Sequence, residues 1–284
     1  MVQIKMCVLI IVPRFNMCVV KKLQVQFPFT ERSICKDWCG INNHIERYYS
    51  QPLEGAKGCV IKIPAMSAPL SVRTEPLGRS VIRGDPYTVW VLKEGYCVSE
   101  ADGSCRADGS ITLLTGPLVV LVDTGGPWDR QLLLDRLAER GVQPGDVSHV
   151  ICTHGHSDHV GNLNLFPGAT LAVACDVSQG DRYLSHGLGE GRPLALDPHV
   201  EVLPTPGHAG RDTSVLVRGC EGGLVLVAGD LFESEGDEES WRGLSQDPAM
   251  QERSRQGALE IADIIIPGHG PPFRVYRDTA APPK

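Results

Sequence analysis

The sequence predicts an α/β protein (α+β in the broad sense) in which β-sheets are covered by a few helices. Three observations support this class: many short apolar segments, two longer segments with helical periodicity, and Gly- or Asp-containing turns between them. The chain has 284 residues, 42% of them hydrophobic, which is enough to bury one or two cores. No apolar stretch reaches the roughly 18 residues of a membrane-spanning helix.

The predicted elements begin near residue 70 and follow one another closely. An amphipathic helix is expected over residues 129–140, where Gly141 ends it, and a second over residues 248–262. The sequence does not by itself define the order of the strands in their sheets. Strands are expected at residues 88–92, 111–114, 118–122, 147–152, 170–174, 200–203, 214–217, 224–228 and 264–266.

The first 65 residues differ from the rest of the chain. They show no sustained period of 2 or 3.6 residues, and they hold nine Lys or Arg against four Asp or Glu. Residues 66–284 hold 18 and 30, so this part carries a net charge of −12. We therefore expect residues 1–65 to be a poorly ordered extension outside the domain, and residues 66–284 to form the domain. An N-terminal arm packed on the domain is the alternative.

The N-terminus does not predict secretion. The apolar run at residues 7–12 is too short for a signal peptide, and Pro13 and Arg14 follow it. Without a signal, the ten cysteines are expected to be free thiols. These features favour a cytoplasmic or nuclear location.

The segment HGHSDH at residues 154–159 carries the strongest chemical signal. Imidazole and carboxylate groups are the usual ligands of zinc and similar ions. Side chains two residues apart on an extended chain point the same way, so His154 and His156 can bind one ion together. Asp158 and His159 follow after the chain turns and can face a second ion. The alternative is a polar loop that is merely rich in histidine.

Three later positions offer the same ligand types. His208 follows Pro206-Gly207, Asp230 follows Gly229 at the end of a strand, and His269 follows Pro267-Gly268. Each ligand is expected where a strand ends, so a rigid scaffold would position it. A closed structural metal site is the less favoured reading, because carboxylates suit open, hydrated ions.

Together these motifs resemble the metallo-β-lactamase superfamily. HGHSDH, TPGH at 205–208, GD at 229–230 and PGHG at 267–270 match its ligand motifs in order, and LVDTGG at 121–126 matches its first motif. The resemblance implies an αββα sandwich of two mixed β-sheets flanked by helices. It also implies one ion on His154, His156 and His208, a second on Asp158, His159 and His269, and Asp230 as the bridge. Asp123 would orient ligands, and Asp158 would also be the catalytic residue.

The glyoxalase-II-like branch is the most similar part of this superfamily. Through it the resemblance implies a dinuclear zinc hydrolase, with iron or manganese as other metals. The leading function is a phosphodiesterase or endoribonuclease, linked to the 3′ end of histone pre-mRNA. The alternatives are a thioester or β-lactam hydrolase and a mononuclear-iron persulfide dioxygenase. RNA is the expected partner, no membrane partner is expected, and a homodimer is left open.

Residues around the ligands give weaker indications. Arg211 and Arg182 are candidates for contact with RNA phosphates, because the acidic domain offers no basic track. The acidic run from Glu233 to Glu239 is expected to be an exposed loop. Only 15 residues of the sequence follow His269, so we expect no counterpart of the helical substrate domain that glyoxalase II enzymes have after this ligand.

Overall fold

The computed structural model describes residues 2–12, 17–27 and 72–277. The chain divides into two compact units, Met1–Met66 and Ser67–Lys284. In the first unit, β1 (Val2–Val12) pairs antiparallel with β2 (Met17–Phe27). The sequence analysis did not predict this strand pair. The other residues of the predicted extension lie outside the described residues. The expectation that the extension is poorly ordered therefore stays a prediction.

The second unit contains an eight-stranded sheet, here called the first sheet. Strand β10 lies near its centre, parallel to β9 and β11, while the other pairs are antiparallel. In spatial order its strands are β13 (Arg182–Tyr183), β12 (Asp176–Gln179), β11 (Thr170–Val173), β10 (His149–Cys152), β9 (Val119–Val122), β8 (Ile111–Thr115), β5 (Thr88–Lys93) and β4 (Val81–Ile82).

A seven-stranded second sheet packs against the first. Strands β17 and β18 are parallel, and the other pairs are antiparallel, so both sheets are mixed. In spatial order its strands are β14 (Leu194–Ala195), β15 (Val200–Pro204), β16 (Thr213–Cys220), β17 (Gly223–Gly229), β18 (Ile264–Pro267), β19 (Phe273–Arg277) and β3 (Val72–Pro76). A separate hairpin joins β6 (Tyr96–Ser99) to β7 (Cys105–Asp108).

The core between the sheets follows from strand alternation. Successive side chains point to opposite faces of a sheet, so every second residue of a strand reaches the same core. In β17, Val225 and Val227 belong to the core between the sheets, whereas Leu226 and Ala228 belong to the core on the outer face. Because a strand of this kind is buried on both faces, its sequence is a continuous run of apolar residues.

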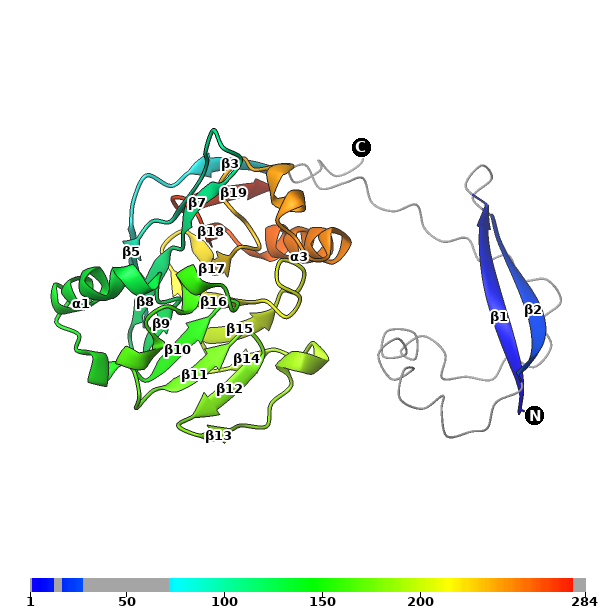
Figure 1. Cartoon of the computed structure of the whole chain (residues 1–284), viewed down its shortest axis with the longest axis horizontal. Coiled ribbons are helices and arrows are strands. Elements are labelled where there is room, and N and C mark those ends of the chain that lie inside the picture. The colour runs from blue at the N-terminus through cyan, green and yellow to red at the C-terminus, as the bar shows by residue number, and fades with distance from the viewer. Residues whose placement is uncertain (1, 13–16, 28–71, 278–284) are drawn as a thin grey trace, which may run out of the picture. The chain divides into compact units, whose positions relative to one another are not determined.

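Helices cover the two outer faces, as Figure 1 shows. Helix α1 (Arg130–Ala138) packs Leu133 and Leu137 on the first sheet. Helix α3 (Pro248–Ile261) packs Ala258 on the second sheet, and the Asp247 side chain caps its N-terminus. The architecture is therefore the expected αββα sandwich. A third helix, α2 (Ser157–Val160), is one turn long and lies within the HGHSDH segment.

Every element predicted between residues 88 and 266 exists, with ends shifted by a few residues. The predictions missed the strands that are short or exposed, such as β6, β7 and β13. Among the residues that the structure describes, none of the helices has the length and apolar character needed to cross a membrane. The five cysteines whose side chains are described, at positions 97, 105, 152, 175 and 220, are free thiols.

Candidate metal centre

All seven predicted ligands lie together at one edge of the sandwich. The HGHSDH segment follows β10 of the first sheet, and the other three ligands follow strands β15, β17 and β18 of the second. Five of them are buried; the exceptions are His156, which is exposed, and Asp158, which is half-buried. The cluster therefore opens to solvent on the side of His156 and Asp158. The set comprises His154, His156, Asp158, His159, His208, Asp230 and His269.

The first group contains His154, His156, His208 and Asp230. His154 Nε2 lies 2.9 Å from His156 Nδ1, and His208 Nε2 lies 3.2 Å from the same atom. Asp230 Oδ2 lies 3.4 Å from His154 Nε2 and 3.2 Å from His208 Nε2. Four potential ligand atoms thus surround one point, as the strand argument for His154 and His156 expected.

The second group contains Asp158, His159 and His269. The Asp158 Oδ2 atom lies 3.8 Å from the Nε2 atoms of both histidines. Asp230 joins the two groups, because its Oδ1 lies 3.2 Å from His159 Nε2 and its Oδ2 lies 3.2 Å from His269 Nε2. One carboxylate thus faces both groups.

The arrangement of the first group fits a metal ion. A tetrahedral zinc site with metal–nitrogen distances of about 2.0–2.1 Å has ligand atoms about 3.4 Å apart. The four distances given above are close to that value. In addition, His159 Nε2 and Asp230 Oδ1 are buried and 3.2 Å apart but not aligned for a hydrogen bond, and neither has another hydrogen-bond partner in the part of the chain that the structure describes. A cation between these atoms would satisfy groups that are otherwise costly to bury.

Asp123 contacts the second group through the outer ring nitrogen of His159. Its Oδ2 accepts a hydrogen bond from His159 Nδ1 at 2.9 Å, and its Oδ1 accepts one from the Thr153 backbone N–H at 2.7 Å. Asp123 has a left-handed backbone with φ of 57°. Asp tolerates this region better than most residues, and such strain is typical of functional sites. The resemblance assigned Asp123 this orienting position.

Close backbone approach explains two of the motif glycines. A Cβ atom on Gly268 would lie 1.9 Å from Asp230 Oδ1. Gly229 has φ of +56°, and a Cβ there would lie 2.4 Å from Thr153 Oγ1. Larger residues would therefore displace Asp230 or the strand end that carries His154.

Burial and charge act in opposite directions on the ligands. Burial holds the pKa of His154 well below its ordinary value. Burial would also lower the pKa of His159, but the Asp230 and Asp123 carboxylates raise it well above that value. Burial would raise the pKa of Asp230, yet the facing His159 and His154 hold it well below its usual range. Asp230 is therefore ionised and ready to bind a cation.

The structure corrects the expectation for the start of the acidic run. Glu233 is buried, with 5% of its surface exposed, and its side chain lies beside His208 and His269. Burial, and next the Asp230 charge, raise the pKa of Glu233 to about 8. Its position three residues after Asp230 was the only sequence signal. The exposed-loop prediction was therefore wrong for Glu233.

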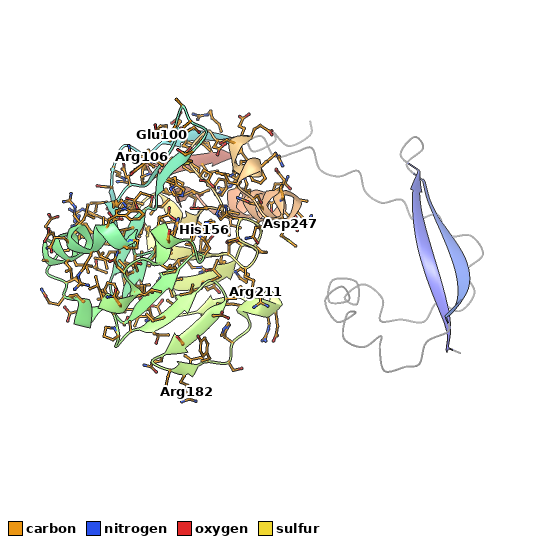
Figure 2. All side chains as sticks on the ribbon, in the orientation of Figure 1. Glu100, Arg106, His156, Arg182, Arg211 and Asp247 are labelled. Carbon is orange, nitrogen blue, oxygen red and sulfur yellow. The ribbon has the colours of Figure 1, made fainter. Side chains whose placement is uncertain are left out.

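The two candidate RNA-contacting arginines lie in different places. Arg182 is on β13, the edge strand of the first sheet, and Figure 2 shows it away from His156. Arg211 is exposed in the loop that carries His208. The next residue, Asp212, is buried and accepts hydrogen bonds from the backbone N–H groups of Gly207 and Ala209. Asp212 thus holds the His208 loop in place.

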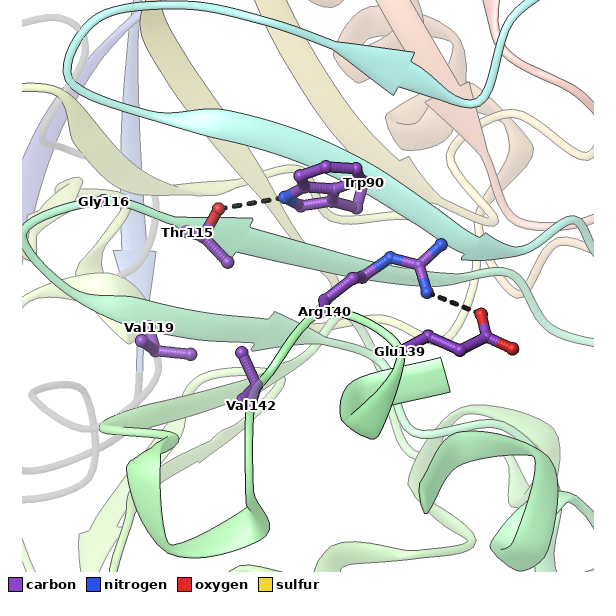
Figure 3. Close-up of a pocket in the computed structure, with 7 residues that line it drawn as sticks. All are labelled: Trp90, Thr115, Gly116, Val119, Glu139, Arg140 and Val142. Carbon is purple, nitrogen blue, oxygen red and sulfur yellow. Dashed lines mark hydrogen bonds and ion pairs between the residues drawn. The ribbon is translucent and has the colours of Figure 1, made fainter. Parts of the chain in front are cut away.

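A hollow outside this cluster lies beside the end of α1 (Figure 3). Trp90 donates a hydrogen bond to Thr115 there, and Arg140 pairs with Glu139. None of the seven predicted ligands lines it. Its lining residues are Trp90, Thr115, Gly116, Val119, Glu139, Arg140 and Val142.

Comparison with known proteins agrees with the motifs and the geometry. The family model for the metallo-beta-lactamase superfamily matches residues 108–269, more than half of the chain. The chain belongs to the metallo-beta-lactamase superfamily. A hydrolase is the general class that this membership supports.

Individual relatives extend the similarity over most of the chain. The chain is 53% identical over 244 residues to metallo-beta-lactamase domain-containing protein 1 of Homo sapiens, covering 74% of this chain and 92% of that protein. The protein of the same name from Xenopus laevis is 54% identical over 210 residues, covering 73% and 90%. Among solved structures, AidC, described as a dizinc quorum-quenching lactonase, matches with a TM-score of 0.51. It is 16% identical and covers 75% of this chain and 99% of its own, so it shows a shared fold.

Proposed function

We propose that the chain is a dinuclear zinc hydrolase that cleaves phosphodiester bonds in RNA. The observation that carries the proposal is the pair of ligand groups joined by Asp230, whose two oxygens face different histidines. When bound, two zinc ions supply activation of water and polarisation of the scissile bond. Imidazole and carboxylate donors suit zinc, and no cysteine belongs to either group.

Each residue of the centre has a role in this proposal. His154, His156 and His208 would hold one ion, and Asp158, His159 and His269 the other. Asp158 lies at the open side of the cluster, with 14% of its side chain exposed. Its carboxylate would therefore contact solvent and substrate, where it can orient the attacking water and accept its proton.

A phosphodiester substrate fits a centre with two cations. In-line displacement develops charge on both the attacking and the leaving oxygen, and ions held by the two ligand groups would stabilise both. Arg211 is exposed on the loop that carries His208, so it can contact a neighbouring phosphate. RNA as the substrate rests on the resemblance to metallo-beta-lactamase domain-containing protein 1, and the residues of the centre support phosphodiester cleavage only in general.

The second candidate is hydrolysis of an acyl bond in a lactone, thioester or lactam. It is favoured by the shared fold with AidC, which is a dizinc lactonase by its description. Ions held by the same ligands would polarise a carbonyl oxygen as well as a phosphoryl oxygen. Persulfide oxidation would instead require iron and would consume oxygen.

The test compares substrates on protein of known metal content. Zinc and iron are measured by elemental analysis, and the zinc-loaded chain is then incubated with end-labelled single-stranded RNA, a lactone, a thioester and a β-lactam. We expect about two zinc ions per chain and cleavage of the RNA. His156→Ala and Asp158→Ala should abolish cleavage while the fold survives. Asp176→Ala, at an exposed position on β12, is the matched control and should retain activity.

Each result assigns the chain to one reaction. Two zinc ions with turnover of an acyl substrate, and no cleavage of RNA, would replace the phosphodiesterase by the acyl hydrolase. A single iron ion with oxygen consumption would indicate the dioxygenase.

The salt dependence of RNA binding is a separate expectation. Because few phosphate contacts are available, the affinity for RNA should fall only gradually as the salt concentration rises.

A further inference from the structure

Glu233 is a buried acid beside the metal centre that the seven-ligand set does not use. It follows Asp230 by three residues, and its backbone carbonyl accepts a hydrogen bond from the His269 N–H at 2.8 Å. Among the described residues, no Lys or Arg lies within 4.0 Å of its carboxylate; the only partners within that distance are His208 and His269. A buried carboxylate without a partner is costly, so the position calls for an explanation.

His208, which lies beside Glu233 Oε1, also has a buried polar atom that lacks a hydrogen-bond partner. His208 points its Nε2 into the first group, so its Nδ1 points away from the cluster. That Nδ1 lies 3.8 Å from Glu233 Oε1. Both atoms are buried, and neither has a hydrogen-bond partner in the described part of the chain. A side-chain movement of less than about 1 Å would bring the pair within hydrogen-bond distance.

The other buried histidines of the centre already have such partners. His159 Nδ1 donates to Asp123 Oδ2 at 2.9 Å, and His269 Nδ1 donates to the Asp108 carbonyl at 3.2 Å. His154 Nδ1 lies 3.1 Å from Thr153 Oγ1. Each outer contact fixes which ring nitrogen carries the proton and how the ring is turned. Only His208 lacks a partner within hydrogen-bond distance in this buried set, and Glu233 is the acceptor within reach.

We propose that Glu233 is a positioning residue that accepts a hydrogen bond from His208 Nδ1 and orients His208 toward the first metal ion. The contact keeps the proton on Nδ1 and leaves Nε2 free for the ion. A hydrogen-bond acceptor at Nδ1 also increases the basicity of the imidazole, which strengthens the bond of Nε2 to a cation.

The loop around Glu233 is held firmly enough for this role. Arg255 of α3 donates hydrogen bonds to the carbonyls of Leu231 and Asp237, on either side of Glu233. Its guanidinium also stacks on Phe232 at 4.3 Å. Arg255 therefore holds in place the segment that carries the Glu233 carboxylate.

A different role for Glu233 is direct ligation of metal. Its Oε2 lies 3.9 Å from His269 Nε2, and the carboxylate forms a close group with Asp230 and His269. The two roles predict different effects of the substitution Glu233→Gln. The glutamine amide oxygen can still accept a hydrogen bond from His208, but an amide is a weak substitute for a carboxylate ligand.

The experiment measures zinc affinity by competition with a coloured chelator for the wild type, Glu233→Gln and Glu233→Ala. Glu233→Ala should weaken binding of one ion by about 10–100-fold, and Glu233→Gln should weaken it less. In a His208→Ala background, Glu233→Ala should have little further effect, because both act through one contact. Loss of the downfield His208 Nδ1–H proton signal in Glu233→Ala is the spectroscopic check. Glu238→Gln, at an exposed position in the same loop, is the matched control.

The outcomes separate this inference from the proposed function, on whose metal centre it rests. Additive effects of Glu233→Ala and His208→Ala would overturn the positioning role. Loss of a whole zinc ion in Glu233→Gln would show a ligand instead and would also overturn it. A wild type that binds zinc without cleaving RNA would change only the substrate. A wild type that binds no zinc would overturn both proposals.

Discussion

Asp123 Oδ2 accepts a hydrogen bond from His159 Nδ1 at 2.9 Å. Because Asp123 Oδ1 also accepts from the Thr153 N–H, the acid ties the end of β10 to the ligand on α2. The first motif of the superfamily thus acts on the metal centre through a neighbour.

Asp123→Asn should reduce zinc affinity by about 10–100-fold with little effect on folding. Asparagine also accepts the left-handed backbone of this position. Its amide nitrogen, however, would face His159 Nδ1 and push the proton onto Nε2, the atom that faces the metal. Chelator competition measures the affinity. Asp135→Asn on the exposed face of α1 should match the wild type, and equal affinities for both variants would contradict the orienting role.

Gly268→Ala should weaken metal binding, because the new Cβ would lie 1.9 Å from Asp230 Oδ1. The carboxylate that joins the groups would have to move, and fewer than two ions should remain per chain. Gly257→Ala is the control, since nothing lies within 4 Å of a Cβ on this α3 glycine. It should leave zinc content unchanged and stabilise the fold by about 0.5–1 kcal/mol. Normal zinc content in Gly268→Ala would show that the centre adapts.

The stability of the fold should fall as pH rises from about 10 to about 12. Burial, and next a hydrogen bond to Asp197, raise the pKa of Tyr87 to about 12, whereas a tyrosine in the unfolded chain ionises near 10. In this interval the unfolded state releases a proton that the folded state retains, so unfolding is favoured. Below pH 10 the contribution is fully present.

Thermal melting across that interval tests the expectation. Tyr87→Phe should have a flatter pH profile than the wild type between pH 10 and 12, because the titrating hydroxyl is gone. The same variant should lose stability at neutral pH, since Asp197 Oδ2 loses the hydrogen bond from the Tyr87 hydroxyl. Parallel pH profiles would show that Tyr87 does not carry the effect.

A chain that begins at Met66 should fold and bind zinc like the full chain. All seven candidate ligands, and the sheets that carry them, lie within residues 67–284. Melting temperature and zinc content measure the effect of the deletion. A large drop in either would mean that residues 1–65 act as an arm of the domain.

The sequence was a good guide to the strands that cross the core. β17 and β18 are apolar on both faces, so their composition alone marks them. The pairing of β3 with β19 could not be predicted, because these strands are far apart in sequence and β3 has no buried residue that would mark it. The exposed β6–β7 hairpin also lacks the apolar pattern that sequence reasoning depends on.

The candidate ligands could be predicted because their residue types are unusual at strand ends. Glu233 could not, because an acid in an acidic run reads as a solvated residue. Only its neighbours in space, His208 and His269, distinguish it from Glu238. Residues that support a ligand come from chain segments whose meeting depends on the whole fold.

The candidate ligands come from both sheets, with four after β10 and three after strands of the second sheet. Bound ions would therefore cross-link the two layers of the sandwich at this edge. Because an ion that binds only the folded state stabilises it, metal loading would raise the melting temperature as well as enable catalysis. The amount of folded protein in a cell would then follow the supply of zinc, so that scarcity removes the protein as well as its activity.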